Sequence, residues 1–391
     1  MKTKKIFIQI AAVLLLFNCL DSYAQFRLTL APYLQDVREN EVTIIWETNE
    51  PANGWVELAP DDGSNFYSQK WPKSHDSFMG IKNIGTLHRV TVKNLEPGTT
   101  YRYRVLSQKA LFSDNPDETL YGEYAATTIY RSRPLEFTTA EKISDTFRFA
   151  VMNDVHEDST LFWNLYEAGK IKDCDFVVFN GDMVSSMPEQ NTIRDKFLRY
   201  ATSTFASEKP FWMVRGNHET RSRYAETYMD YFKTPTGLPY YTYTVGNTFF
   251  IILDSGEDKP DDDIEYFGRS DYDTYRNEEA IWLKKILASD ACKKAEHRIA
   301  IMHIPPVGTT SWYGDREVRR LFLPLLNEAD IDFMLCGHTH NYSYHEADKF
   351  ENKFPVLVND NETVVNVDID KNNISVQIFD RTGKLQKKFK Y

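Results

Sequence analysis

Cysteine is scarce in this sequence of 391 residues, which contains only four. Cys19 lies in the N-terminal segment, and the other three are Cys174, Cys292 and Cys336. Three scattered cysteines are no disulfide framework, because at most one bridge could form among them. No two of them have the CxxC spacing of a cysteine zinc site. We therefore expect all three to be buried and to pack as small apolar side chains.

Positive charge is also in short supply. The chain has 46 Lys and Arg against 57 Asp and Glu, which gives a formal net charge of −11. This balance argues against a nucleic acid partner, because phosphate backbones require a basic surface. A small phosphorylated substrate stays compatible with it, since two bound divalent metal ions supply a local positive field.

Long apolar runs are absent after the first segment of the chain, so no stable membrane span is expected. Residues 1–24 have the form of a signal peptide, with an apolar run of about the right length and small residues before the expected cleavage site. The basic start is Lys2, Lys4 and Lys5, the apolar run is Ile6 to Phe17, and cleavage would follow Ser22-Tyr23-Ala24. Cleavage before Gln25 predicts a secreted or periplasmic protein.

Two alternatives for this segment stay open. It could be a membrane anchor helix, although the apolar run is short for a bilayer core of about 30 Å. The chain could also be a lipoprotein modified at Cys19, although Phe17 and Asn18 stand where a lipidation site has small residues.

The rest of the chain shows two patterns. Residues 25–140 contain short alternating or β-branched runs, such as Glu41–Trp46 and Gly54–Leu58, separated by turn sequences, which predicts an all-β sandwich. After a linker, residues 145–391 alternate apolar strands with helical patterns such as Glu317–Leu326, which predicts an α/β fold. Some later segments look antiparallel, so we expect mixed sheets.

Five apolar strands of the second part each end in residues that can bind a metal ion. In α/β folds, ligands collect at the C-terminal ends of strands. Each motif alone is weak, because such short pairs and triplets are common in turns. The motifs are Asp154-Val155-His156, Gly181-Asp182, Gly216-Asn217-His218-Glu219, His303 and Gly337-His338-Thr339-His340.

Taken in order, these motifs resemble the signature of the calcineurin-like metallophosphoesterases, over the region from Asp154 to His340. Leu95 to Tyr101 resembles the tyrosine corner of fibronectin type III domains. The two-part plan resembles purple acid phosphatases. The resemblance implies a fibronectin type III-like β-sandwich in residues 25–140, followed in residues 145–391 by a catalytic domain with mixed sheets in four α/β/β/α layers.

The same resemblance implies a site with two metal ions. Asp182 corresponds to the carboxylate that bridges the ions. Asp154, His156 and His340 correspond to the other ligands of the first ion, and Asn217, His303 and His338 to those of the second. Imidazole and carboxylate ligands suit zinc, manganese, iron or cobalt. The implied reaction is hydrolysis of phosphate monoesters by a metal-bound hydroxide, with His218 as the general acid.

Other readings remain open at this point. A phosphodiesterase would share every ligand, and a binding protein could use the β-sandwich beside an inactive phosphoesterase domain. Glu219 either orients His218 or hydrogen-bonds nearby, or it is a surface or capping carboxylate. Arg215, Arg221 and Arg223 either bind phosphate or are solvated surface charges. The oligomeric state is left open by the sequence.

One departure from the purple enzymes concerns the metal site. Those enzymes carry a tyrosinate three positions after the bridging Asp, where this chain has Ser185. In the DxH triplet this chain has His156, where they lack a His ligand. We therefore expect no tyrosinate charge-transfer band from the iron-loaded protein.

Overall fold

The computed structural model describes residues 25–127, 133–141, 146–308, 312–371 and 373–391. The predicted signal peptide and the lipidation site considered at Cys19 lie outside these residues. Within them, no helix combines the length and the apolar character needed to cross a membrane. The three described cysteines are buried and unbridged, as predicted.

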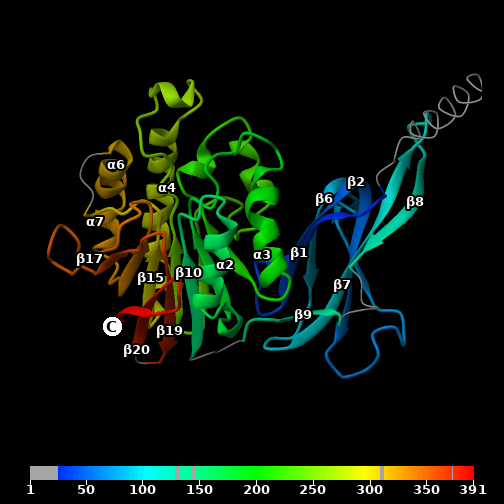
Figure 1. Cartoon of the computed structure of the whole chain (residues 1–391), viewed down its shortest axis with the longest axis horizontal. Coiled ribbons are helices and arrows are strands. Elements are labelled where there is room, and N and C mark those ends of the chain that lie inside the picture. Colours follow the sequence, from blue (N-terminus) through cyan, green and yellow to red (C-terminus); the bar gives the residue numbers. More distant parts are fainter. Residues whose placement is uncertain (1–24, 128–132, 142–145, 309–311, 372) are drawn as a thin grey trace, which may run out of the picture.

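The N-terminal part is built from antiparallel strands (Figure 1). Its core is formed by apolar side chains that include Ile44, Trp46 and Val105. The main strands are β1 (Leu28–Gln35), β2 (Glu41–Pro60), β3 (Lys73–His75), β6 (Ile84–Lys93), β7 (Thr100–Phe112), β8 (Thr119–Ala126) and β9 (Leu135–Thr138), beside a small hairpin of β4 (Ser77–Phe78) and β5 (Ile81–Lys82).

The long strand β2 corrects the sequence analysis, which treated Glu41–Trp46 and Gly54–Leu58 as separate strands. Its first half pairs with β1 and β6, and its second half pairs with β7 and β3. An irregularity between Glu47 and Ala52 shifts the register, so that one strand continues from one layer into the other. The tyrosine corner is present as predicted, since the backbone N–H of Glu96 donates to the Tyr101 hydroxyl at 2.9 Å.

The C-terminal part contains two mixed sheets of six described strands each. Strands β10, β11 and β12 of the first are parallel, as are β14, β15, β16 and β18 of the second. The first sheet has the order β12 (Phe211–Val214), β11 (Phe176–Asn180), β10 (Phe147–Met152), β19 (Thr363–Asp370), β20 (Asn373–Asp380), β21 (Leu385–Lys390). The second has the order β13 (Tyr241–Val245), β14 (Thr248–Ile252), β15 (His297–Ile301), β16 (Phe333–Cys336), β18 (Val356–Val358), β17 (Ser343–His345).

Side-chain alternation along the strands produces the layers. In β10, Phe149 and Val151 point into the core between the two sheets, whereas Ala150 and Met152 point to the helices outside. The first sheet is covered by α2 (Ser159–Ala168), η2 (Arg194–Leu198) and α3 (Arg199–Thr204), and the second by α4 (Tyr272–Leu287), α5 (Asp290–Lys294), α6 (Tyr313–Leu321) and α7 (Leu323–Leu326). The predicted α/β/β/α fold class is confirmed.

The predicted helix over Glu317–Leu326 is two shorter helices, because Pro324 lies in the first turn of α7 and cannot continue the ladder of α6. Short helical turns η1 (Ile171–Asp173), η3 (His218–Thr220), η4 (Ala225–Asp230) and η5 (Ile264–Tyr266) complete the chain.

The two parts share one buried core. Leu30, Tyr33 and Ile45 of the β-sandwich belong to the same apolar cluster as the inner side chains of α2. Figure 1 accordingly shows α2 and α3 on the side of the sheets that faces β1, and α6 and α7 on the far side.

Candidate metal centre

The structure brings all of the predicted site residues to one place. Their strands β10, β11, β12, β15 and β16 end at the same edge of the two packed sheets, and each delivers its motif there. Three overlapping groups of ligand atoms result, each able to hold a metal ion: Asp154, His156 and His340; His156, Asp182 and His218; and Asp182, His303 and His338. Asn217 joins them through its side-chain oxygen, 3.0 Å from Nδ1 of His338.

The buried centre of the site consists of two carboxylates around one imidazole. Nε2 of His303 lies 3.0 Å from Oδ2 of Asp182 and 3.8 Å from Oδ1 of Asp154. On its other side the His303 ring hydrogen-bonds through Nδ1 to the backbone oxygen of Asn180 at 2.7 Å, which directs Nε2 at the carboxylates. Burial by itself lowers the pKa of His303, but the charges of Asp182 and Asp154 outweigh it and raise the pKa to about 10.

These atoms fit a metal ion. Among the described residues, Asp154 Oδ1 and His303 Nε2 are buried polar atoms with no hydrogen-bond partner, although unpaired buried groups of this kind are costly. The negative charges of Asp182 and Asp154, which attract a proton to His303, also attract a metal cation. A metal ion that binds there displaces protons from its ligands. Carboxylate and imidazole donors together suit the transition metals named above.

The more exposed side of the site is made of histidines. Nε2 of His340 lies 3.2 Å from Oδ1 of Asp154 and 3.2 Å from Nε2 of His156. Burial lowers the pKa of His156 and lowers the pKa of His338 to about 4, so both rings favour the neutral form that binds metals. The neighbouring carboxylate of Asp154 raises the pKa of His340.

The backbone at the site is unusual. Asp154, His156, Asp182, His338 and His340 all have positive φ, between 47° and 72°. Such a conformation costs a non-glycine residue about 1–3 kcal/mol and tends to occur at functional sites. It turns the chain sharply after each strand, so that these side chains come together in the three groups of ligand atoms.

Glu219 forms hydrogen bonds near His218, which is one of the readings that the sequence left open. Its carboxylate is buried and accepts backbone N–H groups from Asp182 at 2.9 Å, Met183 at 2.7 Å and Gly216 at 2.9 Å. Burial, with a contribution from Asp182, raises the pKa of Glu219 to about 7. It does not orient the His218 ring, but it fastens the loops after β11 and β12 to each other.

Two asparagines hold Asp154. Asn153 donates to Oδ2 of Asp154 at 2.7 Å, and its own side-chain oxygen accepts from Asn359 at 2.9 Å. Asn359 is not among the predicted site residues, although it follows the apolar strand β18 in the same way as the predicted ligands follow their strands.

His218 lies at the rim of the site. Its backbone N–H donates to Oδ1 of Asp182 at 2.9 Å, and Nδ1 lies 2.8 Å from the backbone oxygen of Ser185. The other ring nitrogen, Nε2, is 3.8 Å from Oδ2 of Asp182 and 3.4 Å from Nη1 of Arg221. The ring is partly exposed, so Nε2 borders both the candidate ligands and the solvent.

The three arginines near this loop differ from one another. Arg215 is neither a phosphate ligand nor a surface charge, because Nη2 pairs with buried Asp254 at 2.5 Å beneath the loop. Arg221 is held by Glu257 at 2.8 Å and by Asp258 at 3.1 Å. Arg223 is exposed. Neither reading of the sequence anticipated the buried carboxylates, which come from the segment after β14.

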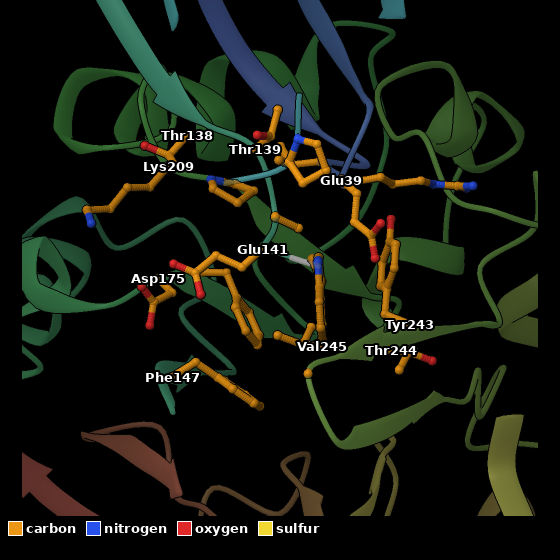
Figure 2. A pocket seen from close by; sticks show the side chains of 18 of the residues that line it. Glu39, Thr138, Thr139, Glu141, Phe147, Asp175, Lys209, Tyr243, Thr244 and Val245 are labelled. Carbon is orange, nitrogen blue, oxygen red and sulfur yellow. The ribbon is translucent and has the colours of Figure 1, made fainter. Parts of the chain in front are cut away.

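Two cavities lie on different sides of this part of the chain. One, of about 970 Å³, adjoins His218 and is lined by Ser185, Arg221 and Arg223 among others. The other, of about 910 Å³, lies between the β-sandwich and the two sheets, where it is lined by residues of β10, β11 and β12 and by Thr242–Val245 of β13 (Figure 2). Figure 2 shows Phe147 and Asp175 at its wall, next to the starts of β10 and β11. The second cavity is therefore at the opposite end of the strands from the candidate metal centre.

The chain belongs to the calcineurin-like phosphoesterase family, whose model matches residues 147–342. The model of the purple acid phosphatase N-terminal domain matches residues 27–128. The predicted family and the purple acid phosphatase-like organisation are therefore confirmed.

Two curated relatives agree with the assignment to this family. Purple acid phosphatase 21 of Arabidopsis thaliana is 25% identical over 276 residues, which cover 66% of this chain and 53% of the relative. The serine/threonine-protein phosphatase CPPED1 of Bos taurus is 24% identical over 173 residues, or 42% of this chain and 53% of the relative. The matches thus span about half the length of these curated relatives.

The fold is that of a solved purple acid phosphatase. The structure of PPD1 from yellow lupin (Lupinus luteus) seeds superposes with a TM-score of 0.65 and covers 92% of this chain and 74% of the lupin chain. The two sequences are 15% identical, so this likeness concerns the architecture of both parts.

Proposed function

We propose that the chain is a dinuclear-metal phosphatase that hydrolyses phosphate monoesters. The observation that supports this most is the position of Asp182, which belongs both to the group with His156 and His218 and to the group with His303 and His338. A carboxylate shared between two ligand groups lowers the repulsion between two neighbouring cations. The two relatives described above are named phosphatases, which supports a monoester substrate.

In this proposal the seven residues divide into two ligand sets around Asp182. When bound, the two ions activate a water molecule as the nucleophile and neutralise charge on the phosphate oxygens. Two carboxylates against two divalent cations leave a positive site, which suits an anionic ester. The first set is Asp154, His156, Asp182 and His340, and the second is Asp182, Asn217, His303 and His338.

His218 is proposed as the general acid. The Ser185 backbone oxygen accepts from Nδ1, which leaves Nε2 as the nitrogen that faces the reacting groups. A proton on Nε2 passes to the departing ester oxygen as the bond to phosphorus breaks. The partly exposed position of the ring gives the leaving group a way out to solvent.

The substitution Asp182→Asn tests the metal site. Loss of the shared negative charge should reduce bound metal below two ions per chain and lower phosphatase activity by at least about a hundredfold. Elemental analysis of the purified protein and rates on a monoester measure the two effects. Asp271→Asn is the control, because Asp271 is exposed and makes no side-chain cap to α4. Full metal content and full activity in Asp182→Asn would rule the proposal out.

The substitution His218→Gln tests the general acid separately. Metal content should stay at the wild-type level, while the rate on an alkyl phosphate falls about 10²–10⁴-fold. A phosphate ester with a strongly acidic phenol should lose much less, because its leaving oxygen needs no proton. Equal losses on both esters, or loss of metal, would mean that His218 acts as a ligand instead.

The phosphodiesterase alternative is tested on the wild-type protein. A faster rate on a diester than on the matched monoester would favour a phosphodiesterase.

We also propose that the protein is secreted or periplasmic, on the basis of the signal-peptide pattern of residues 1–24. Sequencing the N-terminus of protein recovered from outside the cytoplasm of an expressing bacterium should give Gln25 first. A blocked, lipid-bearing N-terminus at Cys19 would point to the lipoprotein alternative.

A further inference from the structure

The cavity beside His218 has the character of a binding site. We name it the acid-side cleft and define it by Ser185, His218, Arg221, Arg223, Phe267 and Arg269, which are among the residues that line it. Four arginines and two glutamates line the cavity, and three of the arginines are paired with carboxylates, which leaves Arg223 as the one arginine of this lining without an ion pair among the described residues. The cleft begins at the nitrogen that borders the candidate ligands and opens away from them.

The inner wall of the cleft is rigid. Arg221 is held on three sides, by Oε1 of Glu257 at 2.8 Å, Oδ1 of Asp258 at 3.1 Å and Oε1 of Glu265 at 3.8 Å. Glu257 is buried and also accepts from the hydroxyls of Thr220 and Tyr266. The charge of Arg221 is therefore compensated within the protein.

The outer wall is tied across the cleft by Arg269. Its Nη1 donates to the backbone oxygens of Ser222 at 3.1 Å and Arg223 at 3.2 Å, and its Nη2 pairs with Glu226 at 2.7 Å. This joins the segment after η5 to the segment before η4. The opening is thus formed by two loops that are fixed to each other before any ligand binds.

Two side chains of the cleft, Arg223 and Phe267, are not fixed in this way. Among the residues that the structure describes, Arg223 forms no ion pair, although its neighbours Arg221 and Arg269 both do. Phe267 is 85% exposed, so its ring is available to a ligand. An uncompensated guanidinium and an open aromatic ring on one cleft match a ligand that is both anionic and aromatic.

We propose that the acid-side cleft binds the leaving group of the ester, and that it selects an aromatic leaving group carrying a negative charge of its own. This inference rests on the proposed function, because protonation by His218 places the departing oxygen at the mouth of the cleft. Water supplies the oxygen of the new bond to phosphorus, the ester bond to phosphorus breaks, and the departing oxygen takes the proton from Nε2. The products are inorganic phosphate and a phenol whose anionic group lies near Arg223.

A pair of nearly isosteric esters tests the charge selection. The metal-loaded protein should hydrolyse 4-carboxyphenyl phosphate with a higher kcat/KM than 4-carbamoylphenyl phosphate. Arg223→Gln should reduce the ratio of the two values by about threefold to fivefold, the range expected for one partly exposed ion pair. Because the ratio is compared between proteins, the different chemical reactivity of the two esters cancels. Arg381→Gln, which removes an exposed arginine in the β20–β21 turn, should leave the ratio unchanged.

A second pair of variants tests the aromatic contact. Phe267→Ala should lower kcat/KM for both aryl esters about threefold to tenfold, and should affect an alkyl phosphate much less. Ile264→Ala is the matched control, because Ile264 is also 85% exposed and belongs to the same segment but does not line the cleft.

The outcomes separate the two proposals. Hydrolysis of both aryl esters with a ratio that Arg223→Gln does not change overturns the charge selection while the proposed function stands. The same holds if Phe267→Ala and Ile264→Ala behave alike, which overturns the aromatic contact. Hydrolysis of no ester by the metal-loaded protein overturns the proposed function, and this inference with it.

Discussion

At the scale of single residues, the site depends on a glycine as well as on the ligand side chains. A Cβ atom built on Gly216 would lie 2.2 Å from Oδ1 of Asp182 and 2.5 Å from its backbone nitrogen. Nothing larger than hydrogen fits there, because the second of these atoms is backbone and cannot turn aside. The glycine before Asn217 is therefore what allows the loops after β11 and β12 to approach each other.

This predicts the effect of Gly216→Ala. The added methyl group should push the Asp182 loop away, lower the free energy of unfolding by about 1–3 kcal/mol and reduce bound metal below two ions per chain. Thermal unfolding and elemental analysis measure these changes. Gly85→Ala is the control, since its Cβ would meet no atom closer than 3.8 Å. A Gly216→Ala protein with the full metal content and stability of the wild type would contradict this account of the loop contact.

At the scale of elements, the sequence predicts where the strands end, but it does not predict the buried side chains that hold the loops after them. Apolar runs followed by Asp or His mark the ends of β10, β11 and β16 because a buried strand must stop where polar side chains begin. Asp254 also follows an apolar run, Phe249–Leu253, but no pattern in the sequence indicates that it pairs with Arg215, or that Glu257 pairs with Arg221. The sequence also does not show that β2 is one continuous strand, because Asn49 to Ala52 has the local pattern of a turn.

A buried histidine in β6 gives this element a pH dependence. His88 stacks on Trp46 with ring centroids 5.1 Å apart, and its Nε2 lies 3.1 Å from the Thr48 hydroxyl. Burial lowers the pKa of His88 to about 4. The unfolded chain, with an ordinary pKa near 6.5, therefore binds more protons than the folded chain between about pH 6.5 and pH 4, and stability falls as the pH falls through this window.

We expect His88→Gln to flatten that dependence. The loss of stability attributable to His88 is at most about 1.4 kcal/mol per pH unit, or ~3 kcal/mol over the whole window. Urea unfolding at pH 7 and pH 4.5 measures it as the difference between the wild type and the variant, so that other acid-titrating groups cancel. His75→Gln in β3, where the ring is only half-buried, should change the dependence less. An identical pH profile for wild type and His88→Gln would contradict the assignment.

At the scale of the whole molecule, the β-sandwich is part of the catalytic scaffold and not an appendage. The Tyr33 hydroxyl donates to the backbone oxygen of Tyr231 at 2.7 Å, and the Tyr103 hydroxyl donates to that of Ser207 at 2.6 Å. Both tyrosines are fully buried. In the opposite direction, the Ser207 hydroxyl donates to the backbone oxygen of Pro32 at 2.6 Å. Buried bonds in both directions indicate that the two parts hold a fixed relation while the site operates.

This arrangement predicts that the two parts unfold together. Calorimetry of the wild type should show one transition, because separating the parts exposes a core that both of them build. Tyr33→Phe and Tyr103→Phe should each lower the free energy of unfolding by about 1–2 kcal/mol, since each leaves a buried carbonyl oxygen without its donor. Tyr124→Phe is the control, because Tyr124 is 61% exposed on the β7–β8 hairpin. Two separate transitions in the wild type, with neither moved by Tyr33→Phe, would mean that the sandwich is an independent unit, and its shared core with α2 would then contribute little to the stability of the metal centre.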